Sequence, residues 1–276
     1  MDGSGFQNWL GATPLWVVAF MLYGAISLAT VVGILLRIWR DRRYASEKNN
    51  DSEHGYIVSA VMGLLALLLG FTFSIAVDRY DTRRHRVLEE ANAIGTTYLR
   101  AQLLQEPHRA RMTGLLVRYT ENRIALAKAK PDPDQARLLA INDALITDIW
   151  AATSAAFDTI KELDFSSAYL ETVNDLIDLD AARKAAMVSR VPPQIFAVLF
   201  IYLVTTAGVL GFVFNGLRGR AALSFLMALF TLSLVLIIDI DQPTLGSIAT
   251  SQRPMEELLK SFKAQSPAVF DKWHGR

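Results

Sequence analysis

The residues best suited to chemistry in this chain are four arginines that follow directly on an apolar run: Arg79, Arg83, Arg84 and Arg86. Beside a membrane, the simplest role for such residues is to anchor the chain to lipid headgroups. The alternative is a basic vestibule that attracts anions. The arginines alone leave both roles open.

Other candidate chemistry is sparse. His85 and Glu89 share one helix face, but two ligands without partners are typical of a surface pair rather than a metal site. Glu171, Asp175 and Asp178 lie on one helical face, which we expect to be solvated. The sequence has no nucleophile elbow, Gly-rich phosphate loop or paired cysteines. We therefore expect no catalytic residue, no metal, no cofactor and no enzymatic activity.

Four nearly uncharged runs set the context for these residues. They cover residues 15–36, 56–77, 193–217 and 221–238, each close to the ~20 apolar residues that a helix needs to cross a bilayer. Continuous apolar runs also exclude the alternating pattern of a β-barrel. The sequence therefore predicts an all-α integral membrane protein with four transmembrane helices and the lipid bilayer as a partner. A net charge of only +1 gives no case for nucleic acid.

Most of the charge falls between the second and third runs, which predicts a helical soluble domain inserted there. The expected organisation is an N-terminal segment (residues 1–14), transmembrane helices 1 and 2 (15–77), the helical domain (78–192), transmembrane helices 3 and 4 (193–240) and a C-terminal tail (241–276). The carboxylates of Asp239 and Asp241, at the end of the fourth helix, are expected to reach the membrane interface.

The second helix is expected to continue unbroken to about Leu104, because a packing stripe recurs along it at spacings of three and four: Val87, Ala91, Ile94, Tyr98 and Ala101. Pro107 suits the first turn of the next helix, which should extend to about Ala129. The third helix of the domain should end near Leu163, with Ser166 as the N-cap of a fourth. Each of these three helices has an apolar face. The faces consist of Met112, Leu116, Tyr119 and Leu126 on the helix after Pro107; Leu138, Ile141, Leu145 and Ile149 on the third helix; and Leu170, Val173, Leu176 and Leu179 on the fourth.

Two motifs carry a resemblance to a known family. Leu69-Gly70-Phe71, followed by Arg79-Tyr80-Asp81, resembles the second membrane helix of bestrophins, which are anion channels. After the fourth run, the segment from Asp241 through Pro243 to Gly246 is similar to the acidic-Pro-Phe-Gly segment that bestrophins carry there. Over most of its length, the chain resembles a bacterial family described as bestrophin-like, which shares these motifs and the Glu89-to-Gly95 segment.

The resemblance implies a function. Bestrophins line a hydrophobic neck with three residues of the second helix, four apart, and the matching positions here are Gly63, Leu67 and Phe71. Gly63 departs from the apolar pattern and would leave the outermost ring wide. The implied protein is a homo-oligomer such as a pentamer in the bacterial inner membrane, conducting anions or other small ions. The calcium-binding acidic cluster of animal bestrophins does not follow Gly246, so calcium gating is not implied.

Two alternatives remain open at this point. Small residues four apart on the second helix are also the usual device for close helix packing in lipid; here they are Ser59 and Gly63, and Ala66, Gly70 and Ser74. A non-conducting sensor or scaffold, whose helical domain binds a partner or ligand, is the rival function. Orientation is similarly divided, because the basic linker from Arg37 to Lys48 favours an extracytoplasmic domain, whereas bestrophins keep the corresponding domain in the cytoplasm.

Overall fold

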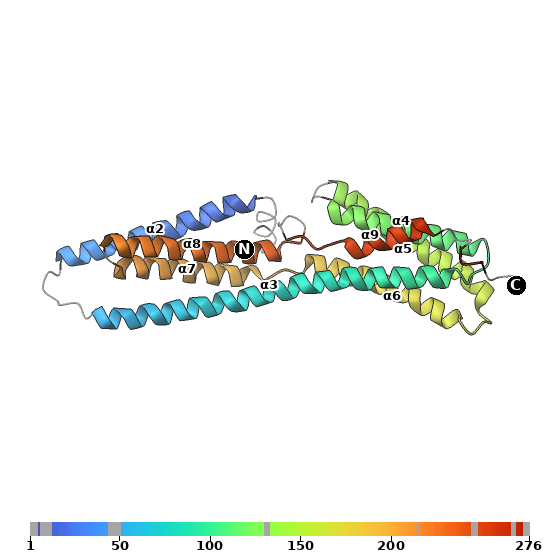
Figure 1. Ribbon diagram of the computed structural model, residues 1–276, viewed down its shortest axis with the longest axis horizontal. Helices are drawn as coiled ribbons and strands as arrows, with labels where there is room; N and C mark the ends of the chain where they lie inside the picture. Colours follow the sequence, from blue (N-terminus) through green and yellow to red (C-terminus); the bar gives the residue numbers. More distant parts are fainter. Residues whose placement is uncertain are drawn as a thin grey trace. The chain divides into compact units, whose positions relative to one another are not determined.

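The structure is a computed structural model that describes residues 5, 13–43, 51–129, 133–214, 216–243, 248–265 and 269–272. Regular structure in these residues is helical, which confirms the predicted all-α class: α2 (Leu15–Arg43), α3 (Asp51–Ala101), α4 (His108–Lys128), α5 (Pro133–Ile160), α6 (Ser166–Val188), α7 (Pro193–Val213), α8 (Gly216–Asp241) and α9 (Arg253–Ala264) (Figure 1). The chain divides into two compact units, unit 1 with Met1–Arg79 and Arg190–Ile248, and unit 2 with Tyr80–Ser189 and Ala249–Arg276.

Within the described part of the chain, four segments are long and apolar enough to cross a membrane, as predicted for a multi-pass membrane protein: Leu15–Arg43, Val58–Ala101, Ser166–Val213 and Arg218–Asp241. The third predicted run, residues 193–217, extends beyond the end of the corresponding helix. Helix α7 stops at Val213, because Phe214 is extended (φ −76°, ψ 132°) and Gly216 takes a positive φ of 72°. Glycine adopts a positive φ without steric cost. The extended Phe214 and the positive φ of Gly216 therefore separate α7 from α8.

In unit 1, glycines bring α2 and α7 into direct backbone contact. A Cβ on Gly33 would overlap the carbonyl oxygen of Gly208, and one on Gly211 would overlap the carbonyl oxygen of Thr30. Small residues at such a crossing let two backbones approach closely in lipid. At one end of this helix pair, Arg37 is buried and its Nη1 donates a 2.7 Å hydrogen bond to the carbonyl of Phe214, just beyond the end of α7.

Unit 2 has one hydrophobic core, and the stripe predicted on α3 forms part of it. All five predicted residues of that stripe are buried, from Val87 to Ala101, together with Met112, Leu116 and Tyr119 of α4. Helix α4 begins at His108 with Pro107 as its N-cap, one residue later than expected, and ends at Lys128. The periodicity of the sequence therefore located both helices correctly.

Three expectations for α5 and α6 differ from the structure in detail. Ile141 is 37% exposed while its neighbour Asn142 is fully buried, because the Asn142 amide donates to Asp180. Ser166 is the first residue of α6 rather than its N-cap; Phe165 holds the cap position, and no side chain there caps the helix. Helix α5 ends at Ile160, three residues before the predicted Leu163.

The C-terminal segment contributes helix α9 to unit 2, an element that the sequence pattern does not predict. Met255 is fully buried in the core, and Leu258 packs against the core so closely that a Cβ on Gly95 of α3 would lie 3.3 Å from its Cδ1. Phe262 stacks on Tyr98 with ring centroids 4.0 Å apart. Helix α9 is thus an integral part of the bundle.

Candidate functional site

The predicted neck residues lie together on one exposed face of α3. Leu67 is 52% exposed and Phe71 61% exposed, and Gly63 is exposed on the same side of the helix. The opposite side packs within unit 1 through a buried stripe, which consists of Leu65, Leu69, Thr72 and Ala76. Helical geometry separates the two faces, because residues three and four apart share a side. The neck face is therefore left uncovered by the described part of its own chain.

Two glycines on the exposed face of α3, Gly63 and Gly70, make no close contact within the described chain. A Cβ added to Gly63 or Gly70 would meet no atom within 4 Å. The glycines that join helices are instead those of the α2–α7 crossing, at Gly33 and Gly211. Packing inside the chain thus does not account for the small residues along the exposed face of α3.

Within unit 1, the last residue on the exposed face of α3 is Asp78, whose side chain is exposed. Asp78 lies one helical turn beyond Ser74, and both are exposed on the side of Phe71. The four arginines that follow have different surroundings: Arg79 is half-buried, Arg83 is only 2% exposed, Arg84 is exposed, and Arg86 pairs with Glu89 at 2.8 Å. Both the lipid-anchor role and the vestibule role of these arginines remain predictions.

The motif after α8 is partly described, because Gly246 lies outside the described residues. Asp239 and Asp241 are both 6% exposed, so their carboxylates are buried within the protein. The physical reason is a hydrogen bond: the backbone N–H of Val191, just before α7, donates to Asp241 Oδ1 at 2.9 Å. Asp241 and buried Pro243 thus belong to the interior of unit 1, where Asp241 joins the end of α8 to the start of α7.

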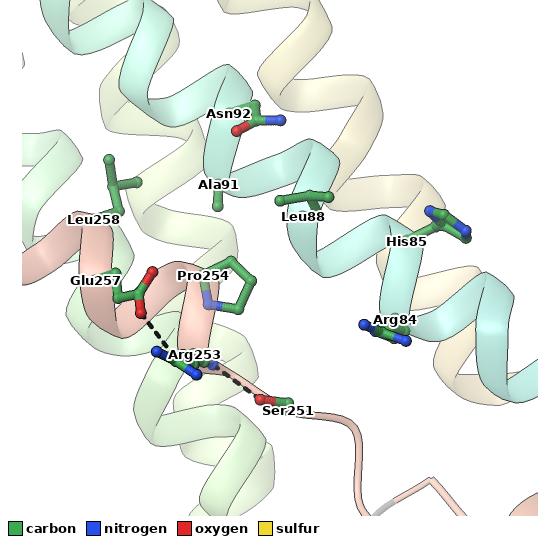
Figure 2. Close-up of a pocket in the computed structure, with 10 residues that line it drawn as sticks. All are labelled: Arg84, His85, Leu88, Ala91, Asn92, Ser251, Arg253, Pro254, Glu257 and Leu258. Atoms are coloured by element: carbon green, nitrogen blue, oxygen red, sulfur yellow. Dashed lines mark hydrogen bonds and ion pairs between the residues drawn. The ribbon is translucent and has the colours of Figure 1, made fainter.

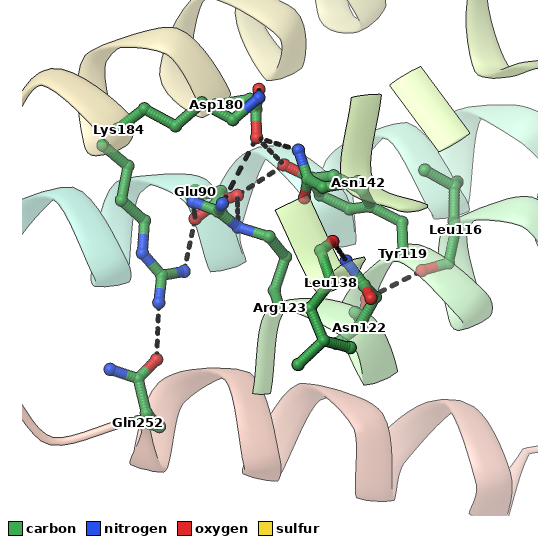
Figure 3. A network of polar contacts seen from close by, with 12 residues as sticks. Glu90, Leu116, Tyr119, Asn122, Arg123, Leu138, Asn142, Asp180, Lys184 and Gln252 are labelled. Carbon is green, nitrogen blue, oxygen red and sulfur yellow. Dashed lines mark hydrogen bonds and ion pairs between the residues drawn. The ribbon is translucent and has the colours of Figure 1, made fainter. Parts of the chain in front are cut away.

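Unit 2 contains a buried network of charged side chains centred on Glu90, which is fully buried on α3 (Figure 3). Two guanidinium groups bind its carboxylate: Arg123 of α4, with Nε 2.7 Å from Oε1, and Arg183 of α6, which donates to Oε2. The Tyr119 hydroxyl lies 2.5 Å from Glu90 Oε1 and 3.0 Å from Asp180 Oδ1. The network joins α3, α4 and α6.

Asp180 forms the second acidic centre of this network. Its carboxylate accepts a 2.8 Å hydrogen bond from Asn142 of α5 and lies 2.6 Å from Lys184 Nζ. Burial alone would raise the pKa of Asp180, but hydrogen bonds from Lys184 and Asn142, together with the charge of Arg123, hold it below its ordinary value. Burial and the neighbouring Glu90 charge raise the pKa of Tyr119 well above 10, so its hydroxyl stays protonated. Arg183 also donates to Gln252 Oε1 at 2.6 Å, which connects the network to the segment before α9.

A groove of about 640 Å³ lies between α3 and the start of α9 in unit 2 (Figure 2). Arg84 and His85 lie along the α3 side and Arg253 on the α9 side, where Arg253 Nε pairs with Glu257 at 2.7 Å. Glu89 pairs with Arg86 rather than with His85. Among the described residues, no group of three or more His, Cys, Asp or Glu side chains could hold a metal ion.

Residues 23–255 match the Bestrophin-like domain, which is most of the chain. The chain belongs to the Bestrophin-like family. No curated protein matches it. Among solved structures, a bacterial bestrophin homolog from Klebsiella pneumoniae superposes with a TM-score of 0.63 at 16% identity, covering 88% of this chain and 98% of that chain. A single-residue variant of that homolog gives the same TM-score and identity, with 89% and 98% covered. At these identities the likeness establishes a shared fold.

The Glu90 network is the part of this bestrophin-like chain that sequence reasoning missed. A signal was present, because Glu90 lies three residues after Val87 and four before Ile94, within the predicted core stripe of α3. A carboxylate on such a stripe is expected to have a buried cationic partner. The partner arginines could not be found in the same way, since they come from helices about 30 and 90 residues further along the chain.

Proposed function

We propose that this bestrophin-like protein is a homo-oligomeric channel for small ions in the bacterial inner membrane, with Gly63, Leu67 and Phe71 at its neck. The observation that carries the proposal is the uncovered face of α3, on which Leu67 and Phe71 project away from the stripe that packs within unit 1. Membership of the Bestrophin-like family and the shared bacterial bestrophin fold support it.

A symmetric ring of copies would turn this face into a pore lining. Closed rotational symmetry repeats one helix around an axis, so each apolar side chain becomes a ring. Leu67 and Phe71 would form two rings about 6 Å apart along the helix axis, which is one turn. Apolar constrictions of this kind gate ions by dewetting. Gly63 would contribute no side chain, so the ring at its level would be wider.

The ion class follows from what borders the neck. Asp78, exposed at the end of the same face in unit 1, would contribute a ring of carboxylates, and rings of acidic side chains favour cations. Arg83, by contrast, is buried. The proposal is therefore a small-ion channel in which cations pass more readily than the anions implied by the family resemblance.

Reconstitution in planar bilayers tests this function, with two phenylalanines as a matched pair. Phe71 lies on the proposed neck face, whereas Phe73, 41% exposed, lies off it. Phe71→Ala should change the single-channel current and Phe73→Ala should leave it unaltered. A correctly folded oligomer that stays silent, or equal effects of the two substitutions, would refute the neck assignment. Mass photometry of the purified protein should find a ring such as a pentamer.

The rival function is a non-conducting sensor whose unit 2 binds a ligand. The groove beside α9 is the observation that favours it, since Arg84 and Arg253 offer cationic groups across an open cavity. A monomer or a two-fold dimer, without current, would support this alternative.

In the proposed channel, unit 2 and both termini face the cytoplasm, following the bestrophin resemblance, although the basic α2–α3 linker favours the opposite by the positive-inside rule. Reporter fusions after Ala129 and after Arg276, one active only in the cytoplasm and one only outside it, decide between the two orientations. An extracytoplasmic unit 2 would remove the argument for a bestrophin-like arrangement and favour the sensor.

A further inference from the structure

A second cavity in the structure, a groove of about 210 Å³ between α2 and α8 in unit 1, has no role in the proposed channel. Its floor is made by Leu223 and Met227, which are 4% and 2% exposed. Val31 and Ile34 of α2 form part of the wall, and Tyr23 lies at the far end from Ile34 along that helix. From Tyr23 to Ile34 the helix rises about 16 Å, which makes the groove long and narrow.

The groove has a charge at one end. Arg220, near the start of α8, lines it and is exposed, and no ion pair joins it to another residue of the described chain. Helix α8 begins only four residues earlier, at Gly216, so the positive end of its dipole lies nearby. The end of α2 adds two more arginines. Arg40 lies over the Phe212 ring, with its guanidinium carbon 4.6 Å from the centroid, and also pairs with Asp41 at 2.9 Å; Arg43 lies over Trp39 at 4.9 Å.

The depth of these features matches the layers of a bilayer. Trp16 and Trp39 are both exposed, near opposite ends of α2, and are about 34 Å apart at 1.5 Å per residue. Tryptophans gather at the two membrane interfaces, which border a hydrocarbon core of about 30 Å. The apolar part of the groove therefore lies at acyl-chain depth, and its cationic end lies near the headgroups on the Trp39 side.

We propose that this groove binds an anionic phospholipid, with one acyl chain along Val31, Ile34, Leu223 and Met227 and the headgroup phosphate at Arg220. Both helices are candidate membrane spans, so lipid is the medium around them. A phosphate complements an exposed guanidinium beside a helix N-terminus. The apolar floor selects a lipid over free phosphate, because phosphate alone would leave the groove unfilled. This site is independent of whether the protein conducts ions.

Native mass spectrometry of the full-length protein in detergent tests the site, with phosphatidylglycerol and phosphatidylcholine of identical acyl chains as probes. Phosphatidylglycerol should bind more tightly, and inorganic phosphate should not displace it. Arg220→Ala should weaken its binding about fivefold, the effect of about 1 kcal/mol for one basic residue near a membrane surface. Arg218→Ala, an exposed neighbour that does not line the groove, should have a smaller effect.

Two valines provide the matched steric test. Val31 and Val32 are 48% and 46% exposed, but only Val31 lines the groove. Val31→Trp should remove the bound phosphatidylglycerol and Val32→Trp should retain it, with unchanged gel-filtration profiles and melting temperatures as the folding control. Equal loss in both variants, no preference over phosphatidylcholine, or an equal effect of Arg218→Ala would overturn the proposal. Because the sequence contains no cysteine, Val31→Cys can also be cross-linked selectively. Cross-links between copies in membranes would assign the groove to a second chain instead of a lipid.

Discussion

Removing the charge of Glu90 should destabilise unit 2 far more than removing the charge of its neighbour Glu89. Glu90 is fully buried and holds two guanidinium groups, those of Arg123 and Arg183, which are themselves at most 4% exposed. In Glu90→Gln the amide cannot neutralise them, so Arg183 retains no anionic partner among the described contacts. Breaking a buried pair in this way costs about 3–5 kcal/mol.

Glu89 is the matched control, because it is the adjacent residue on the same helix and also binds an arginine. Its 2.8 Å pair with Arg86 is on the surface, with side-chain exposures of 39% for Arg86 and 48% for Glu89. Exposed pairs contribute about 0–1 kcal/mol. The two glutamates have the same side chain and differ in burial and in the number of arginines that they bind.

Thermal unfolding of the detergent-solubilised protein, followed by circular dichroism, measures the difference. At about 2–4 °C per kcal/mol, Glu90→Gln should lower the melting temperature by at least about 6 °C, and Glu89→Gln by no more than about 4 °C. Adding Arg183→Gln to Glu90→Gln should cost less than the sum of the single changes, because the second change removes a charge that the first left unpaired. Equal melting temperatures for the two single variants, or strict additivity in the double variant, would refute the account of the network.

Three further outcomes follow from the structure. Gly211→Ala should lower the melting temperature, since its Cβ would overlap the Thr30 carbonyl, whereas Gly24→Ala meets no atom within 4 Å and should be neutral or stabilising. The pKa of Tyr119 is raised in the folded protein, so its contribution to stability is complete below pH ~10 and is lost as the pH rises through the folded pKa. Tyr119→Phe should therefore flatten the fall in melting temperature at alkaline pH. Part of that fall should remain, because burial raises the pKa of Tyr169 to about 12. Asp78→Asn should move the reversal potential of reconstituted channels in a salt gradient toward that of anions, and an unchanged potential would remove Asp78 from the ion path.

The features that sequence periodicity could predict are those that depend on one helix at a time. The four apolar runs needed only a count of uncharged residues, and the stripe from Val87 to Ala101 needed only the helical repeat. The error at the end of α7 has a local cause, because hydropathy continues through Leu217 while Gly216 turns the backbone. Hydropathy does not detect a turn of this kind when the residues on both sides of it are apolar.

The features that could not be predicted depend on contacts between helices. Ile141 is more apolar than Asn142, yet Asn142 is the buried residue, because Asp180 on another helix needs a donor. The burial of Asp241 likewise depends on the N–H of Val191, fifty residues away in the sequence. In both cases a polar residue is buried because a partner satisfies its hydrogen-bonding groups, and the partner cannot be identified from local pattern.

The pair Glu89 and Glu90 shows where single-helix reasoning could have gone further. In a chain whose charge is concentrated between membrane helices, both residues are naturally assigned to a solvated surface. The helical repeat separates them by about 100°, which places Glu90 beside Val87 and Ile94 and directs Glu89 outward to Arg86. An unpaired carboxylate is too costly to bury. The position of Glu90 on the buried side of α3 therefore implies that cationic groups from other helices lie in the core. The buried charge was therefore deducible from the sequence, while the identity of its partners, Arg123 and Arg183, required the fold.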